Sequence, residues 1–245
     1  NTFLLQIISS FKFVNYAISL SSGTKMPRIK WNDIKNFELL LPTIPEQKKI
    51  EQIILDVNEL LYQISELIKK KKNIHQGAMQ ELLTGKRRLR GFNEKWEEKT
   101  LKDIVEIPIS DGPHETPKFL HDGIPFLSVN NIENNQIDLS SLRYISTEDH
   151  IRFSKKCKPQ KGDILLGKAA SVGHVAIIDF SFEFNIWSPL ALIRINNNNI
   201  GKFIYYYIQT KHIKNQIIFL THSSSQGNLG MGEMEKLEFL LPLKK

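Results

Sequence analysis

The sequence is poor in cysteine and has no long uninterrupted apolar run. Among its 245 residues there is one cysteine, Cys157. A single thiol excludes an intrachain disulfide and a thiolate metal cluster, so we expect a reducing, cytoplasmic setting, with Cys157 as a small buried apolar residue. The first twenty residues are largely apolar, but Gln6, Lys12 and Asn15 interrupt them well before the about 18 apolar residues of a membrane span. We expect neither a signal peptide nor contact with a membrane, and a chain that starts inside a folded unit.

Catalytic motifs are missing as well. No G-x-S-x-G segment nominates a serine nucleophile, and the seven histidines form no metal-binding spacing with cysteine or carboxylate. Two patterns would indicate an enzyme acting on DNA: a glycine-rich cofactor loop followed by an Asn- or Asp-Pro-Pro-aromatic motif, or an acidic cluster with a lysine. Neither occurs. We therefore expect a chain with no catalytic residue and no bound metal.

Two segments imitate catalytic motifs. GDILLGKA at 162–169 has the spacing of a phosphate-binding loop, but Ala169 stands where a hydroxyl should bind magnesium, and the apolar residues before it indicate a buried strand. HETPKFLH at 114–121 has two histidines and a glutamate, but Pro117 breaks the helix that a zinc protease needs. Both segments are expected to be parts of strands and loops.

Positive charge exceeds negative charge. There are 33 Lys and Arg residues against 26 Asp and Glu residues, which gives a net charge of +7. This balance favours a polyanionic partner such as nucleic acid, without proving one. The apolar content of 41% is enough for a sizeable core.

A phrase near the start of the chain recurs at its end. FELLLP occupies 37–42, and LEFLLP occupies 237–242, an offset of 200 residues. At this offset Leu40, Leu41 and Pro42 recur as leucine, leucine and proline. The repeat indicates a diverged internal duplication.

A long amphipathic helix is predicted between the two copies. Apolar residues recur at intervals of three and four from residue 50 onwards, and they hold two heptad positions over four heptads. Extending from Glu46 to Thr84, the helix would be roughly 58 Å long at about 1.5 Å per residue, with Gly85 as its stop. Lys71 is the polar exception. Such a stripe requires a partner helix, and the expected interface consists of Ile50, Ile53, Val57, Leu60, Ile64, Leu67 and Ile74.

The remainder of the chain is predicted to be a mixed domain. Short apolar segments at 123–129, 162–167, 174–179 and 189–195 are bounded by Gly, Pro, Asn or Asp and are typical of strands. The segment 203–220 favours a helix or a pair of helices. The predicted fold class is α+β: a globular mixed domain attached to a long helix that forms a coiled coil.

Several motifs in order resemble a known family. They are PEQKKIEQIIL after a Leu-Pro turn, GAMQELLTGKRRLRGF, the spacing of Trp96, Leu101, Asp103 and Ile104, then GPHETP, GIPFLSVNNI and GDILLGKAASVGHVAII. Together they resemble the specificity subunit of Type I restriction-modification enzymes, over nearly the whole chain. The set is specific, although each motif alone is not.

The resemblance implies a non-catalytic subunit that recognises double-stranded DNA. Residues 1–42 would be the end of a first target-recognition domain, 43–91 the spacer helix, and 92–245 a second recognition domain reading one half of a bipartite target. Methyltransferase and endonuclease or translocase subunits would be its partners, and S-adenosylmethionine would be bound by the methyltransferase, with no cofactor in this chain. The spacer helices of the family lie antiparallel, so a second copy is expected to supply the missing helix, making a homodimer.

Two alternatives remain open: a structural coiled-coil adaptor without DNA affinity, and a catalytic methyltransferase or nuclease. For DNA contacts, three polar loops at 110–118, 168–174 and 222–230 are predicted, with Asn130 and Asn131 as weaker candidates. These side chains have donors and acceptors suited to base edges or phosphates. The candidates are His114, Thr116, Lys118, Asn130, Asn131, Lys168, Ser171, Gln226 and Asn228.

Overall fold

The computed structural model describes residues 2–23, 26–196, 198–222 and 227–242. The chain divides into two compact units, Asn1–Asn73 and Ile74–Lys245, and each is treated by itself below. Helix α4 (Ile44–Leu82) passes from the first unit into the second. No helix in the described ranges is both long enough and apolar enough to cross a membrane.

The first unit is helical. Besides the beginning of α4 it contains α1 (Thr2–Ile8), α2 (Phe11–Leu20) and α3 (Trp31–Ile34). Ser10 caps α2, because its hydroxyl accepts a hydrogen bond of 3.3 Å from the Phe13 N–H. The aromatic rings of Phe13 and Tyr16 each lie 5.0 Å from that of Phe37, which ties α2 to the segment after α3.

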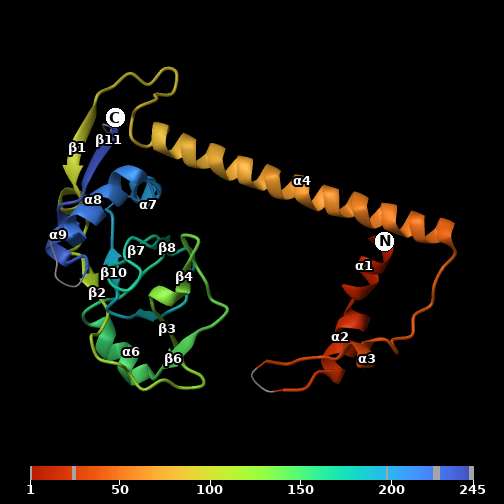
Figure 1. The fold of residues 1–245 in the computed structure, drawn as a ribbon. Helices are drawn as coiled ribbons and strands as arrows, with labels where there is room; N and C mark the ends of the chain where they lie inside the picture. The colour runs from red at the N-terminus through yellow and green to blue at the C-terminus, as the bar shows by residue number, and fades with distance from the viewer. Residues whose placement is uncertain (1, 24–25, 197, 223–226, 243–245) are drawn as a thin grey trace. The chain divides into compact units, whose positions relative to one another are not determined.

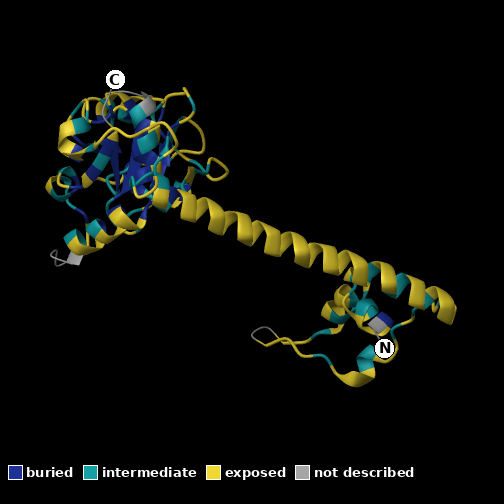
Figure 2. Cartoon of the chain, turned by 90° about the horizontal axis from the view of Figure 1, so that it is seen from above, coloured by how far each residue is buried: buried dark blue, intermediate teal, exposed yellow. Residues whose placement is uncertain are grey.

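Helix α4 begins two residues before the predicted start and ends two residues before the predicted end. Pro45 lies in its first turn, where the missing N–H costs nothing. Gly85 follows the helix with a positive φ of 71°, as expected of a glycine that ends a helix. Among the described residues of α4, Met79 is the buried one, and the helix is exposed along most of its length (Figure 2).

The second unit is built on a four-stranded antiparallel sheet of order β2-β10-β7-β8 (Figure 1). Its strands are β2 (Ser110–Asp111), β7 (Ile164–Gly167), β8 (Val175–Ile177) and β10 (Leu190–Ile193). A three-stranded sheet has the order β6-β3-β9, with β3 (Ile124–Leu127), β6 (Arg143–Ile145) and β9 (Asn185–Ile186). The hairpin of β4 (Ile132–Glu133) and β5 (Gln136–Ile137) is preceded by the 3-10 helix Val129–Asn131.

Helices cover one face of the four-stranded sheet. Ile164 and Leu166 of β7 pack in one cluster with residues of α7 (Asn198–Ile208) and α8 (Lys211–His222), whereas Leu165 packs in a second cluster with residues of β3 and β9. Strand β7 is thus buried on both faces, which explains its continuous apolar sequence. Cys157 belongs to the second cluster, and burial raises its pKa to about 11, so the prediction of a buried apolar residue is confirmed.

The remaining elements frame the domain. Helices α5 (Leu101–Ile104) and α6 (Thr147–Ser154) are short, and α9 (Met231–Glu235) comes just before the last strand. That strand, β11 (Glu238–Pro242), pairs antiparallel with β1 (Trp96–Thr100), which begins the domain. The predicted strands at 123–129, 162–167, 174–179 and 189–195 contain β3, β7, β8 and β10, and the predicted helical pair is α7 and α8. The α+β prediction is confirmed.

The internal duplication extends to the helices. At the offset of 200 residues, α1, α2 and α3 correspond to α7, α8 and α9, and residues 38–42 correspond to β11. Residues 38–42 and β11 differ in one respect: β11 pairs with β1, whereas residues 38–42 form no strand. Leu41 is accordingly 68% exposed, while its counterpart Leu241 is 9% exposed. The described residues of the first unit therefore repeat the helical end of the second unit, and residues 38–42 have no partner strand among them.

Candidate nucleic-acid interface

The described parts of the three predicted loops meet around Lys168. This residue follows β7, and its Nζ lies 3.0 Å from Oδ2 of Asp111, so the first loop and the second loop are joined by an ion pair. The backbone carbonyl of Lys168 accepts a 2.9 Å hydrogen bond from the Leu229 N–H, which brings the described end of the third loop to the same place. Loops that are up to 119 positions apart in the sequence, from 110 to 229, thus form one surface.

Asp111 is the centre of a cluster of basic side chains. Its side chain is 6% exposed, and its Oδ1 lies 2.5 Å from Nζ of Lys156. Its Oδ2 lies 3.1 Å from Nε2 of His114 and also accepts from Lys168. Burial alone raises the pKa of the Asp111 carboxyl, but the hydrogen bonds and charges of Lys156 and Lys168 outweigh it, and the pKa is lowered. The carboxylate is therefore ionised at neutral pH.

Close backbone approaches fix the shape of these loops. A Cβ on Gly112 would lie 1.7 Å from the backbone oxygen of Ile186, so only glycine fits at this position. Gly167 has a similar constraint, because its Cβ would lie 2.3 Å from the Ser171 oxygen. Ala170 has a positive φ of 62° in the tight turn that carries Lys168 into the cluster. The glycines of GPHETP and GDILLGKA thus serve packing and turn geometry.

The predicted DNA-contacting residues differ in how far their side chains are exposed to solvent. His114, Thr116, Lys118, Asn130 and Asn228 are exposed in the structure. Ser171 is half-buried in the turn after β7. The side chain of Lys168 is only 17% exposed, since it points to Asp111. Gln226 lies outside the described residues.

Asn131 is engaged in local structure. Its side-chain oxygen accepts a 3.0 Å hydrogen bond from the Ser128 N–H, and its amide nitrogen donates to the backbone oxygens of Asp138 and Ser141 at 3.2 Å and 3.1 Å. These bonds hold the segment around the β4-β5 hairpin. The side chain thus has few hydrogen-bonding positions left for a base.

Sequence reasoning missed Asp111 and Lys156. Asp111 directly precedes the GPHETP motif. Nothing in the neighbouring sequence indicates that its carboxylate pairs with Lys156 and Lys168. Lys156 is 45 residues away from it in the sequence and is placed by the end of α6. The available signal was the D-G pair at a predicted loop, which is typical of a turn.

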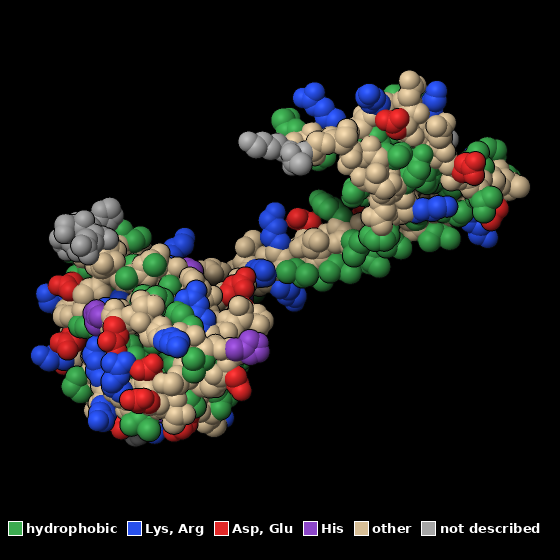
Figure 3. All heavy atoms as spheres, turned by 90° about the horizontal axis from the view of Figure 1, so that it is seen from below, with side chains coloured by type: hydrophobic (Ala, Val, Ile, Leu, Met, Phe, Trp, Pro, Cys, Tyr) green, Lys and Arg blue, Asp and Glu red, His purple; other side chains and the backbone are tan. Residues whose placement is uncertain are grey.

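The predicted helix-pairing residues form an apolar band on α4. Ile53, Val57, Leu60, Leu67 and Ile74 are between 50% and 57% exposed, and Ile64 is 45% exposed. Ile50 is half-buried. The space-filling view shows hydrophobic side chains in a band along the helix (Figure 3). Such a band is typical of an interface with another helix.

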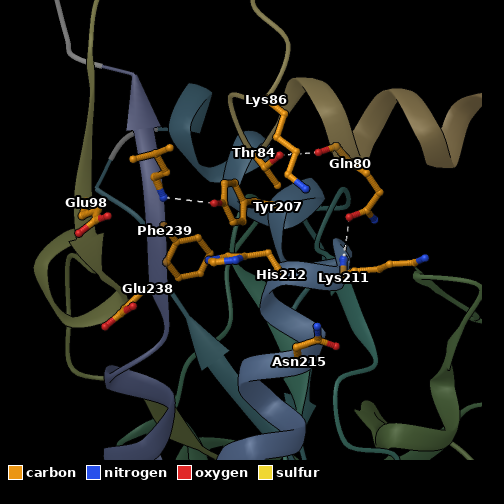
Figure 4. Close-up of a pocket in the computed structure, with 11 residues that line it drawn as sticks. Gln80, Thr84, Lys86, Glu98, Tyr207, Lys211, His212, Asn215, Glu238 and Phe239 are labelled. Carbon is orange, nitrogen blue, oxygen red and sulfur yellow. Dashed lines mark hydrogen bonds between the residues drawn. The ribbon is translucent and has the colours of Figure 1, made fainter.

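Within the second unit, the end of α4 borders a hollow of about 590 Å³. Gln80, Thr84 and Lys86 face Tyr207 and His212 across it (Figure 4). The side-chain oxygen of Gln80 accepts a 2.9 Å hydrogen bond from the backbone N–H that begins α8. In the described ranges, no group of three or more His, Cys, Asp or Glu side chains is placed to hold a metal ion.

Polar loops that meet at the end of an antiparallel sheet, together with an exposed apolar band on a helix, are typical of a protein that binds other macromolecules. Residues 93–245 match the family described as Type I restriction modification DNA specificity domain, which is more than half of the chain. The chain belongs to this family, and the resemblance stated above is confirmed.

Two relatives extend the comparison. The Type I restriction enzyme MjaVIII specificity subunit of Methanocaldococcus jannaschii is 24% identical over 210 residues, covering 82% of this chain and 47% of that protein. The Type I restriction enzyme EcoBI specificity subunit of Escherichia coli is 24% identical over 203 residues, covering 73% of this chain and 43% of that protein. The chain thus spans about half the length of these relatives.

A solved structure supports the fold. The crystal structure of the Type-I restriction-modification system S subunit from M. genitalium has a TM-score of 0.55 and 19% sequence identity, over 94% of this chain and 60% of that chain. At this identity the likeness concerns the fold, including mixed strands and helices in an α+β arrangement.

Proposed function

We propose that this chain is a DNA-binding specificity subunit of a Type I restriction-modification system, and that residues 92–245 recognise one half of a bipartite target. The observation that carries the proposal is the convergence of three polar loops on the Lys168–Asp111 pair. Family membership supports it, and so does the net charge of +7, since a polyanion favours a basic partner. Phosphate contacts would position the domain, and exposed polar side chains would contact base edges.

The proposed organisation has three parts. Residues 1–42 are the end of a first recognition domain, 43–91 the spacer and 92–245 a second recognition domain. The repeat at an offset of 200 residues supports the first assignment, and the family match from residue 93 supports the third. The chain is proposed to be non-catalytic, with reactions carried out by partner subunits.

Partners would dock on the spacer helix. We expect methyltransferase subunits, which would bring S-adenosylmethionine, and endonuclease or translocase subunits in the larger assembly. The exposed apolar band of α4 supports pairing with an antiparallel second copy, which gives a two-fold homodimer. Such a dimer would carry one complete recognition domain at each end and would recognise a palindromic split site.

The same apolar band is compatible with a second function, a coiled-coil adaptor without DNA affinity. The two functions differ in one measurable property. An adaptor would show no affinity for duplex DNA, alone or assembled with a methyltransferase, whereas a specificity subunit would bind DNA in a salt-dependent way.

The salt dependence of DNA binding tests the loop assignment. Replacing Lys168 and Lys118 by alanine should weaken binding to a labelled mixed-sequence duplex. Each lost phosphate contact should reduce the slope of log K against log[salt] by about 0.9. Fluorescence anisotropy over a series of KCl concentrations gives both quantities.

Lys70→Ala is the matched control, because Lys70 is an exposed lysine on α4 and belongs to none of the three candidate loops. It should leave the slope close to that of the natural chain. An unchanged affinity and slope in the Lys168→Ala and Lys118→Ala double variant would show that the loops have been assigned wrongly.

A further inference from the structure

Asp111 is a buried carboxylate whose partners come from three separate segments. His114 lies in the loop after β2, Lys156 follows α6, and Lys168 follows β7. A buried carboxylate with cationic partners is common in protein cores, but this one lies where the candidate DNA loops meet. It also joins the segment HETPKFLH, through His114, to the segment GDILLGKA, through Lys168.

We propose that Asp111 is the positioning residue of the DNA interface: it holds Lys156, Lys168 and His114 in one arrangement and so makes binding selective for sequence. The inference rests on the proposed function. Asp111 does not contact DNA in this scheme, because an anion would be repelled by phosphate. Its effect passes through the two lysines and His114.

The charges of the cluster fit this role. Two lysines contribute +2 and Asp111 contributes −1, so these three side chains together carry a net charge of +1. Lys156 donates to Asp111 Oδ1 at 2.5 Å and to the Gly112 oxygen at 3.2 Å, which leaves one of its three N–H groups for a ligand. His114 is 70% exposed on its side chain while bound to Asp111. Cations are thus offered to a phosphate or base in fixed positions.

Asp111 itself is fixed by the backbone. It lies in β2, where it pairs with Ala191 of β10. The following residue, Gly112, is packed against the Ile186 backbone, and the Pro113 oxygen accepts a hydrogen bond from the Ser188 N–H at 3.2 Å. Free lysine side chains have many rotamers. Because a fixed Asp111 already restricts the rotamers of its lysine partners, these side chains lose less conformational entropy when DNA binds. A preorganised set of donors discriminates better between sequences than a mobile one.

The experiment uses the full chain and a library of random-sequence duplexes. The natural chain should enrich a defined motif after rounds of selection. Asp111→Asn should bind mixed-sequence DNA several-fold more tightly, with a salt slope steeper by about 0.9, because a lysine released from Asp111 can neutralise one more phosphate. The motif enriched by this variant should carry less sequence information.

Asp179→Asn is the matched control, with the same change of charge at an exposed residue after β8. It should raise affinity less and leave the enriched motif unchanged. Asp111→Glu separates charge from position: it should keep the natural salt slope but lose sequence information, since the longer side chain displaces the lysines.

If Asp111→Asn does not fold, Lys156→Ala tests the same proposal. The Lys156 side chain is 51% exposed, so its removal should be tolerated, and it should reduce both the salt slope and the information in the motif. An Asp111→Asn variant that behaves like Asp179→Asn, or a Lys156→Ala variant with an unchanged motif, would overturn the positioning role. A natural chain without DNA affinity would contradict the proposed function instead.

Discussion

A chain in which Leu60 and Leu67 are replaced by glutamate should be monomeric under conditions in which the natural chain is dimeric. The two leucines are 56% and 54% exposed in the single chain, so the substitutions leave its own fold intact. In a two-fold dimer four leucines would leave the interface, at about 1.5 kcal/mol or more each. Because about 1.4 kcal/mol changes an equilibrium tenfold, the dimer Kd should rise by about 10⁴-fold or more.

Sedimentation equilibrium or light scattering at micromolar concentration measures this effect. Asn58→Glu with Ser65→Glu is the matched control, since it adds the same charge at the same spacing on exposed polar positions outside the apolar band. The control should remain dimeric. A natural chain that is strictly monomeric at these concentrations, or a Leu60→Glu and Leu67→Glu variant that still dimerises, would exclude the proposed homodimer.

The long helix and the central strands are the elements that the sequence predicts best. The heptad pattern places α4 within two residues at each end, because a seam of apolar residues is a local property of a helix. Strands β7 and β10 are predicted because they are buried on both faces, and burial on both faces requires a run of apolar residues.

The interior of the candidate site is less predictable. The ion pair of Asp111 and Lys156 joins residues 45 positions apart, and no spacing rule covers a contact made through the tertiary fold. The spacing of a phosphate loop makes Lys168 a candidate for DNA contact, but in the structure its ammonium group pairs with Asp111 and is mostly shielded from solvent. Asn131 is also a polar residue in a predicted loop, but its side chain is hydrogen-bonded to the neighbouring backbone.

The duplication is apparent in the sequence at 37–42 and 237–242, but its extent is not. Upstream of these phrases the residues have diverged, so the correspondence of α1, α2 and α3 with α7, α8 and α9 depends on the structure. Helix order is retained after sequence identity is lost, because packing requires apolar residues at a given spacing and tolerates substitution among them. The same reason explains how relatives that are 24% identical belong to one family.

Replacing Gly112 by alanine should destabilise the recognition domain by about 3 kcal/mol or more, which is at the upper end of overpacking effects. The new Cβ would lie 1.7 Å from the Ile186 oxygen and 2.5 Å from the Ile186 carbon. Both are backbone atoms of β9, so relief requires a strand to move rather than a side chain to turn. The shift would also displace Asp111, and DNA binding should fall with stability.

Urea unfolding, followed by circular dichroism at one protein concentration, measures the change for Gly112→Ala beside Gly77→Ala. Gly77 lies in α4 with no atom within 4 Å of the position a Cβ would occupy. Alanine there should stabilise the helix by about 0.8–1.0 kcal/mol, since glycine is the poorer helix former. The same substitution is thus expected to act in opposite directions at the two glycines. Equal midpoints for Gly112→Ala and the natural chain would mean that Gly112 and Ile186 of β9 do not approach as closely as the structure places them.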